Sequence, residues 1–327
     1  RNSCNPGTSC RVPAGPIASR SLHRRHPAKE SGMTRAQTLP DASRPMVGVV
    51  LMLGAMASLP FIDVFAKSLG QQGVPILLIV WARLAFGTLV TLPFALRHTT
   101  ARGLFPNRLL YHSLRAGFLS LATFSFFYSL KFLPIADALA IFFVQPLIVT
   151  ILSALVLKEK VGPRRWAAVA VGFVGTLIII RPGFAEVNPG SLLALAAGAF
   201  LAIYFVMTRR ISGTAPAMLT TFQTNAVGAV LITVLLPFVW QMPTPGQWLM
   251  LASLGTIATL GHFLIVRAYD FAEASLLAPL AYTEMIMSTI AGWVFFGDFP
   301  DVWTFVGVAI LIACALYISW RERAAMG

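Results

Sequence analysis

Ionisable side chains inside long apolar stretches are the residues of this sequence that could do chemistry. Glu284 lies near the middle of the apolar stretch 273–297, Arg83 lies within 75–96 and His262 within 248–267. Arg115 lies near the start of the stretch 109–130. Placing a charge at the centre of an apolar membrane helix costs about 2.5–3.5 kcal/mol on insertion scales, so each of these positions is a candidate functional site.

The chemistry open to these residues follows from their side chains. Glu284 could bind a cationic group of a ligand or take up a proton. Arg83 or Arg115 could hold a carboxylate or a phosphate, and His262 could relay protons. Each also has a structural alternative, namely a hydrogen bond between packed helices, a pair with an internal acid, or a long side chain that reaches the membrane surface.

The composition indicates which solvent surrounds these residues. The AVILMFWYC class makes up 57% of the 327 residues and DEKR only 11%, whereas about 25% charged residues are typical of soluble domains. Mean hydropathy is +0.76. So few charges could not cover a soluble surface, which predicts an integral membrane protein. The three cysteines have no metal-ligand spacing, so we expect no metal and no cofactor.

Ten apolar stretches follow one another from Met46 onward, and most are long enough to cross about 30 Å of hydrocarbon as a helix. Gly- and Pro-containing connections separate them. The fold prediction is therefore an all-α integral membrane protein with ten transmembrane helices. The stretches are 46–66, 75–96, 109–130, 134–157, 166–180, 191–208, 217–240, 248–267, 273–297 and 302–320.

The basic residues predict the orientation. With the N-terminus inside, inner segments carry 20 of the 25 Lys and Arg, outer connections carry three, and two lie within stretches. This asymmetry satisfies the positive-inside rule, so we expect both termini in the cytoplasm, most simply of a bacterium with this chain in its inner (plasma) membrane. Residues 1–45 are basic and lack an apolar run, which predicts a disordered extension. Met33 can serve as a start, so residues 1–32 are interpreted as a possible spurious upstream extension. An Arg- and Ser-rich, acid-poor segment of this kind also resembles an organellar transit peptide, which is the alternative.

Connections in the two halves of the chain carry opposite charge. The fourth stretch is followed by Lys158-Glu159-Lys160 and two arginines, whereas Gly297–Asp301, after the ninth, holds no Lys or Arg. Five spans is an odd number, so a duplicated half must insert upside down. This predicts two inverted five-helix repeats, 46–181 and 190–323, a device that carriers use to place a substrate site near the midplane.

Aligning Glu159 with Asp298 places Gln145 opposite Glu284, since both pairs are separated by the same number of residues. We therefore hypothesise that Gln145 and Glu284 face one midplane cavity. Aligning the Ala-acid-Ala triplets 136–138 and 272–274 instead would match Gln145 with Ala281, so the register stays open. Aromatic side chains are expected to form the rest of the wall, with Phe127, Tyr128 and Tyr282 as candidates.

Several motifs resemble the EamA-type, ten-helix branch of the drug/metabolite transporter superfamily. They are the run Phe126 to Ala138 (FFYSLKFLPIADA), Lys158-Glu159-Lys160 with Trp166, and Phe295 to Trp303 (FFGDFPDVW). The chain departs from the family pattern at Lys158, where Gly is usual, and at Asp298, where Glu is usual. The resemblance implies small-molecule carriage without ATP hydrolysis, through a cavity lined by both halves.

The expected function is a secondary active transporter, an exporter or exchanger for a small polar metabolite such as an amino acid. An uptake carrier for a vitamin or an S-adenosylmethionine-like metabolite is the alternative, followed by a channel or a membrane-embedded enzyme. No metalloprotease, nucleophile-elbow or Walker motif is present, so we expect no enzymatic activity. The expected partners are the small-molecule substrate, the lipid bilayer and a coupling proton, but no nucleic acid.

Two further expectations concern helix contacts. Asp63 precedes Lys67 by four residues, which predicts an i,i+4 pair near the outer end of the first span. The spacings Ala168/Gly172 and Gly198/Ala202 suit close helix packing, either within the chain or in a homodimer.

Overall fold

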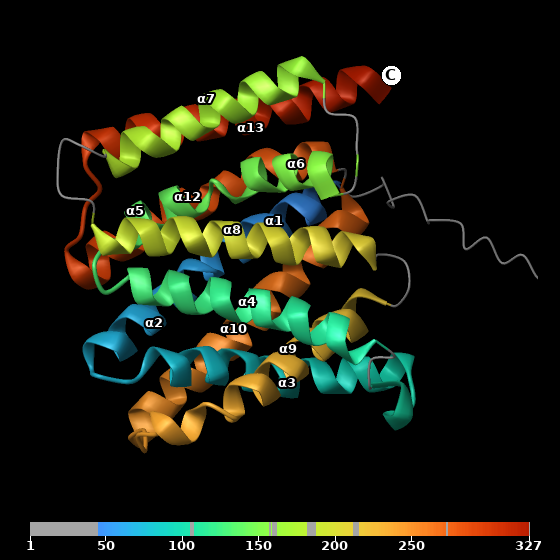
Figure 1. The fold of residues 1–327 in the computed structure, drawn as a ribbon, viewed down its shortest axis with the longest axis vertical. Coiled ribbons are helices and arrows are strands. Elements are labelled where there is room, and N and C mark those ends of the chain that lie inside the picture. Colours follow the sequence, from blue (N-terminus) through green and yellow to red (C-terminus); the bar gives the residue numbers. More distant parts are fainter. Residues whose placement is uncertain are drawn as a thin grey trace, which may run out of the picture. The chain divides into compact units, whose positions relative to one another are not determined.

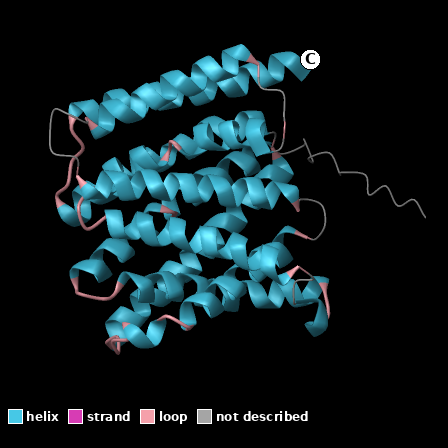
Figure 2. Ribbon diagram, in the orientation of Figure 1, coloured by secondary structure: helices cyan, strands magenta, loops and turns pink. Residues whose placement is uncertain are grey.

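The computed structural model describes residues 45–104, 108–156, 158, 162–181, 188–211, 216–272 and 274–326. These residues form helices and their connections, with no strand among them (Figure 1, Figure 2). The extension predicted to be disordered lies outside the described residues, apart from Pro45.

The described helices make up ten spans, which confirms the predicted all-α fold of two inverted five-helix repeats. Five helical segments, Pro45–Gln71, Ile76–Arg97, Ile135–Val156, Pro189–Arg210 and Pro245–Phe271, are long and apolar enough to cross a membrane, and three apolar helices are shorter. The first half contains α1 (Pro45–Ser58), α2 (Pro60–Gln71), α3 (Ile76–His98), α4 (Leu109–Ser129), α5 (Ile135–Phe142), α6 (Gln145–Val156) and α7 (Pro163–Ile180). The second half contains α8 (Pro189–Arg210), α9 (Ala217–Thr233), α10 (Pro245–Phe271), α11 (Ala274–Leu277), α12 (Thr283–Phe296) and α13 (Val302–Met326). Short 3-10 turns lie at Ala101–Leu104, Leu236–Phe238 and Ala278–Tyr282.

Three spans are interrupted part-way. Pro60 begins α2 directly after α1, because proline lacks the N–H that would continue the helix but fits its first turn. The fourth span breaks between α5 and α6, and the ninth passes through α11 and a 3-10 turn before α12 begins. Interrupted helices at membrane depth are tolerated where they line a cavity or are buried in protein.

The helix contacts follow the expected symmetry of an inverted repeat. The most extensive contacts join α4 to α8, α7 to α13, α3 to α9 and α1 to α10. Exchanging the two halves converts the contact of the first and eighth spans into that of the sixth and third. The pair α1·α10 thus corresponds to α8·α4, while α3·α9 and α7·α13 each map onto themselves. Every one of these contacts crosses between the halves.

Small residues bring helices of the same chain together. A Cβ added to Gly172 would lie 2.5 Å from Leu147 Cδ1, and one added to Gly198 would lie 3.0 Å from the Phe142 carbonyl oxygen. α7 and α13 lie side by side (Figure 1), and a Cβ on Gly307 would lie 2.6 Å from the Gly175 oxygen. The predicted small-residue spacings therefore serve packing within the chain.

Candidate functional site

A cavity of about 300 Å³ lies between the two halves. Its apolar wall includes Phe126, Phe127, Phe142 and Phe205. Among its polar lining residues, the first half contributes Asp63, Arg83 and Thr123, and the second half contributes Tyr204, Thr221, Thr224, Asn225, Thr259, His262 and Glu284. The cavity thus combines aromatic surface with cationic and acidic groups.

The structure brings together half of the site residues predicted from the sequence. Those that line the cavity are Arg83, Phe127, His262 and Glu284. Those absent from its lining are Arg115, Tyr128, Gln145 and Tyr282. Glu284 lines the cavity and Gln145 is not among its lining residues, so the hypothesis that the two share one cavity stays a prediction. The two residues do hold similar places in the chain, because Gln145 is the first residue of α6 and Glu284 the second of α12.

Arg83 reaches the cavity from α3. Its Nη1 donates a hydrogen bond to Thr123 Oγ1 at 2.6 Å. No ion pair joins Arg83 to any acid in the described part of the chain, although it interacts electrostatically with Asp63. A guanidinium held by a neutral hydroxyl keeps donors free for a ligand anion.

Asp63 is the cavity residue that sequence reasoning misplaced. It does not pair with Lys67, because Lys67 binds Asp298 instead. Asp63 lies in the first turn of α2 and lines the cavity with 7% of its surface exposed. The signal that could have located it is Pro60, which starts a new helix inside the span and places Asp63 in the first turn of that helix.

Arg115 lies behind the cavity wall and does not line it. Its guanidinium is fully buried and donates to the Thr220 carbonyl at 3.1 Å and to the Thr224 hydroxyl. It also lies 5.7 Å from the centre of the Tyr204 ring. Since Thr224 and Tyr204 both line the cavity, Arg115 holds the wall from α4 without facing a substrate.

The remaining predicted aromatic residues pack against neighbouring rings. Tyr128 stacks on Phe124 with ring centres 5.7 Å apart, and Tyr282 lies 6.1 Å from Phe143. Phe127, in contrast, contributes to the cavity and also to a second pocket.

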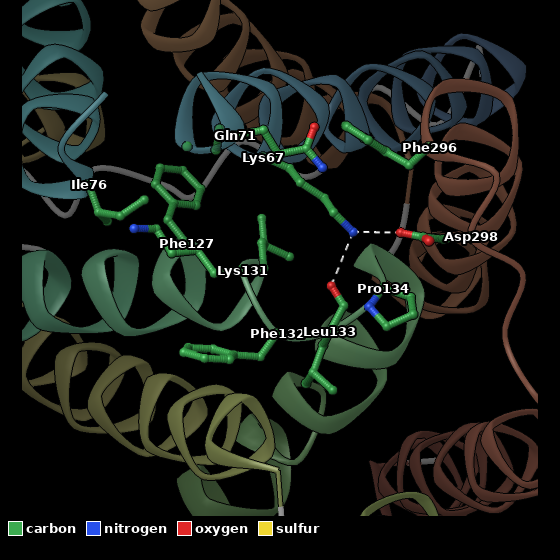
Figure 3. Close-up of a pocket in the computed structure, with 13 residues that line it drawn as sticks. Lys67, Gln71, Ile76, Phe127, Lys131, Phe132, Leu133, Pro134, Phe296 and Asp298 are labelled. Atoms are coloured by element: carbon green, nitrogen blue, oxygen red, sulfur yellow. Dashed lines mark hydrogen bonds and ion pairs between the residues drawn. The ribbon is translucent and has the colours of Figure 1, made fainter. Parts of the chain in front are cut away.

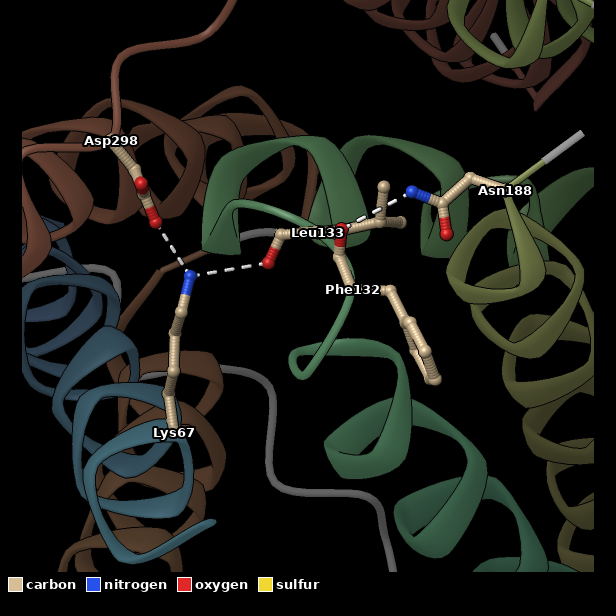
Figure 4. A network of polar contacts seen from close by, with 5 residues as sticks. All are labelled: Lys67, Phe132, Leu133, Asn188 and Asp298. Atoms are coloured by element: carbon tan, nitrogen blue, oxygen red, sulfur yellow. Dashed lines mark hydrogen bonds and ion pairs between the residues drawn. The ribbon is translucent and has the colours of Figure 1, made fainter. Parts of the chain in front are cut away.

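The second pocket, of about 460 Å³, lies where α2 and α12 end (Figure 3). Lys67 Nζ is 2.6 Å from Asp298 Oδ2 and donates to the Leu133 carbonyl at 3.2 Å (Figure 4). Nearby, Asn188 Nδ2 donates to the Phe132 carbonyl at 3.2 Å. Lys67 belongs to the first half and Asp298 to the second, so this network ties the halves together.

A second ion pair crosses between the halves. Arg181, which follows α7, pairs with Asp301, which precedes α13. Asp301 Oδ1 also accepts hydrogen bonds from the backbone N–H and the hydroxyl of Thr304, at 2.8 and 3.0 Å. Asp301 therefore caps α13 while it binds the other half of the chain.

No group of three or more His, Cys, Asp or Glu side chains in the described residues could hold a metal ion.

A model of the EamA-like transporter family matches residues 46–181 and 188–320. A riboflavin transporter of Vibrio cholerae is 29% identical over 285 residues, covering 85% of this chain and 95% of that protein. An S-adenosylmethionine uptake transporter of Rickettsia bellii is 29% identical over 280 residues, with 86% and 96% covered. A pseudopaline exporter of Pseudomonas aeruginosa is 26% identical over 203 residues, with 61% and 70% covered. A crystal structure of a protein that is 21% identical shares the fold, with a TM-score of 0.58 over 87% of this chain and 99% of that one. The chain therefore belongs to the EamA-like transporter family.

Proposed function

We propose that this protein is a secondary active carrier that moves a small polar metabolite by alternating access, with the cavity between the halves as its substrate site. The observation that carries this proposal is the cavity itself, where Arg83 from one half and Glu284 from the other line a largely apolar space. Buried charges without protein partners are costly, and a ligand of opposite charge offsets that cost.

The lining favours a substrate that has both a carboxylate and a flat ring. Arg83 can bind a carboxylate through its free N–H donors, and Phe126, Phe127 and Tyr204 offer faces for a ring. S-adenosylmethionine, an amino acid derivative, has both groups, and relatives are named as its uptake transporters. This supports uptake of an amino-acid-derived metabolite over the export of a plain amino acid.

A vitamin such as riboflavin is the second candidate. The aromatic wall suits a flat ring system without requiring a carboxylate, and relatives are named riboflavin transporters. The two substrates differ in their dependence on Arg83, because riboflavin has no carboxylate for it to bind.

The ion pairs between the halves fit an alternating-access cycle. By the distribution of basic residues, Lys67–Asp298 and Arg181–Asp301 face the outside of a bacterial inner membrane, and both termini are cytoplasmic. In this proposal the two pairs form when the carrier is closed to the outside and separate when it opens on that side.

The test is counterflow in proteoliposomes with labelled S-adenosylmethionine and labelled riboflavin. We expect saturable uptake of S-adenosylmethionine that unlabelled S-adenosylmethionine inside the vesicles accelerates. Arg83→Gln should abolish it, while Arg267→Gln, which alters an exposed arginine on α10, should not. If riboflavin alone is exchanged and Arg83→Gln does not affect this exchange, riboflavin is the substrate. Flux that neither saturates nor responds to internal substrate would contradict a carrier.

A further inference from the structure

Asp63 is a buried acid without a hydrogen-bond or ion-pair partner among the described residues. Its side chain is 7% exposed and lines the central cavity. In the described part of the chain it makes no hydrogen bond and no ion pair. A buried carboxylate that no hydrogen bond or ion pair satisfies is costly, so it binds a cation, binds a proton or is paired with a ligand.

Glu284 lines the same cavity in a matching position. Asp63 lies in the first turn of α2 and Glu284 in the first turn of α12, each following an interruption of its span. Glu284 likewise makes no hydrogen bond or ion pair with the described residues. α2 packs directly against α12, and the two carboxylates interact electrostatically. One acid therefore comes from each half of the transporter.

The other charged groups that face this pair are few. α3 contributes Arg83, α10 contributes His262, and α8 contributes Tyr204. The residues of α4 and α5 that line the cavity carry no ionisable group. Lys67, on α2 itself, is held in the second pocket by Asp298. With His262 neutral, two carboxylates face one guanidinium, so a single positive charge neutralises the cavity.

A proton fits this place better than a metal ion. Hard metal cations take six or more oxygen ligands at short distance, whereas Asp63 has Leu59 and Ile62 beside it in the cavity wall. Two carboxylates that line one cavity and interact electrostatically can instead bind one proton as a coupled pair.

We propose that Asp63 and Glu284 form a single proton site across the two halves of the chain, and that the proton held there is coupled to substrate movement. This rests on the proposed carrier function and names its coupling ion. Because one acid comes from each half, the bound proton reduces the repulsion between the two carboxylates where α2 contacts α12. That contact can therefore persist while the two halves move relative to one another.

Proton binding can be measured without a substrate, by following the infrared band of protonated carboxyl groups against pH in purified protein. The wild type should show one proton bound by the pair. Asp63→Asn and Glu284→Gln should each change the titration of the acid that remains, and the double variant should lose the signal. Asp270→Asn, an exposed acid on α10, is the matched control and should leave the signal unchanged.

Independent behaviour would overturn the proposal. If each single variant removes one titrating carboxyl signal and the remaining acid titrates at the same pH as in the wild type, the two acids share no proton. Asp63→Glu and Glu284→Asp keep both carboxyl groups and should retain the coupled titration. These two conservative variants distinguish loss of the shared proton from loss of folding, and size-exclusion chromatography identifies any variant that does not fold.

Coupling to transport is measured with labelled S-adenosylmethionine in proteoliposomes. Wild-type flux should respond to an imposed pH difference, and Asp63→Asn and Glu284→Gln should lose this response. Asp270→Asn, outside the cavity, should keep both counterflow and the response to pH. Wild-type response retained in both variants contradicts the proposal. If the wild type shows no counterflow, the proposed substrate is wrong, while the infrared titration still decides the proton site.

Discussion

At the residue scale, Arg115 is an unusual structural group because a fully buried guanidinium holds three helices together without an acidic partner in the described residues. Its hydrogen bonds reach Thr208 on α8 and Thr220 and Thr224 on α9. Lysine has one ammonium group and cannot reproduce this fork. We expect Arg115→Lys to lower stability by roughly 1–3 kcal/mol and to lower the temperature of thermal unfolding. Arg267→Lys, on the exposed face of α10, should leave it unchanged, and an equal effect of both variants would contradict a specific role for Arg115.

Asp301 sets a second prediction, on pH. Burial raises the pKa of its carboxyl, but hydrogen bonds from Thr304 and the charge of Arg181 outweigh it and hold the pKa below the usual range. A carboxyl whose pKa is lower in the folded protein than in the unfolded chain stabilises the folded protein at pH values above the unfolded pKa. This contribution is lost as the pH falls through the folded pKa. The contact therefore stays intact from pH 5 to 8. We expect the rate of counterflow in Asp301→Asn to depend on pH between 5 and 8 in the same way as in the wild type. A changed pH dependence would mean that a group at this contact titrates in that range.

Residue-level prediction from sequence named Arg83, His262 and Glu284 because each carries an ionisable group deep in an apolar stretch, and all three line the cavity. It failed for Asp63, because an acid four residues before a lysine is equally consistent with a helix-surface pair. Gln145 is not among the residues that line the cavity. The repeat alignment fixes its position along the chain but not which way its side chain points beside a helix break. The partners of Arg115 lie about a hundred residues away in sequence, and no local pattern reveals them.

At the element scale, the contact of α7 with α13 depends on two glycines that face each other. A methyl group on Gly307 would come within 2.4 Å of Ile179 Cγ1 as well as close to the Gly175 oxygen. Helix backbones cannot yield without separating the pair, so we expect Gly307→Ala to destabilise by about 1–3 kcal/mol, measured by thermal unfolding. Gly54→Ala on α1 meets nothing within 4 Å, and should be neutral or slightly stabilising because alanine favours helix. A neutral Gly307→Ala would show that the two helices can adjust independently.

The ten spans and their connections follow from hydropathy and from Gly and Pro residues, because a bilayer admits few other structures. The interruptions were harder to predict. Pro60, Pro146 and Pro279 mark the broken spans, but Pro93 lies inside the continuous helix α3. Proline thus indicates where a helix can break, whereas tertiary packing decides whether it does.

At the scale of the whole molecule, the two halves are joined by apolar helix contacts over their length and by ion pairs at one end. The opposite charge of corresponding connections, visible in the sequence, has a structural consequence there. The connection between α12 and α13 carries Asp298 and Asp301 but no base, so it can accept Lys67 and Arg181 from the first half. Inversion of the repeat thus supplies complementary charges to one face of the transporter.

Separating the Lys67–Asp298 pair should shift the carrier toward opening at this end. Ala66 lines the second pocket and is 1% exposed, so Ala66→Cys in a background without native cysteines reports opening through its labelling by a membrane-impermeant maleimide. We expect Lys67→Ala and Asp298→Ala to speed this labelling. Lys67→Ala removes the ion pair and the hydrogen bond to the Leu133 carbonyl, and Asp298→Ala leaves Lys67 without its counter-charge. The exchanged pair Lys67→Asp/Asp298→Lys should slow it again toward the starting rate. Lys131→Ala removes the neighbouring exposed lysine of the same pocket and should have no effect. Equal labelling in all of these variants would mean that the ion pair does not hold this end closed, and that the apolar contacts between the halves suffice.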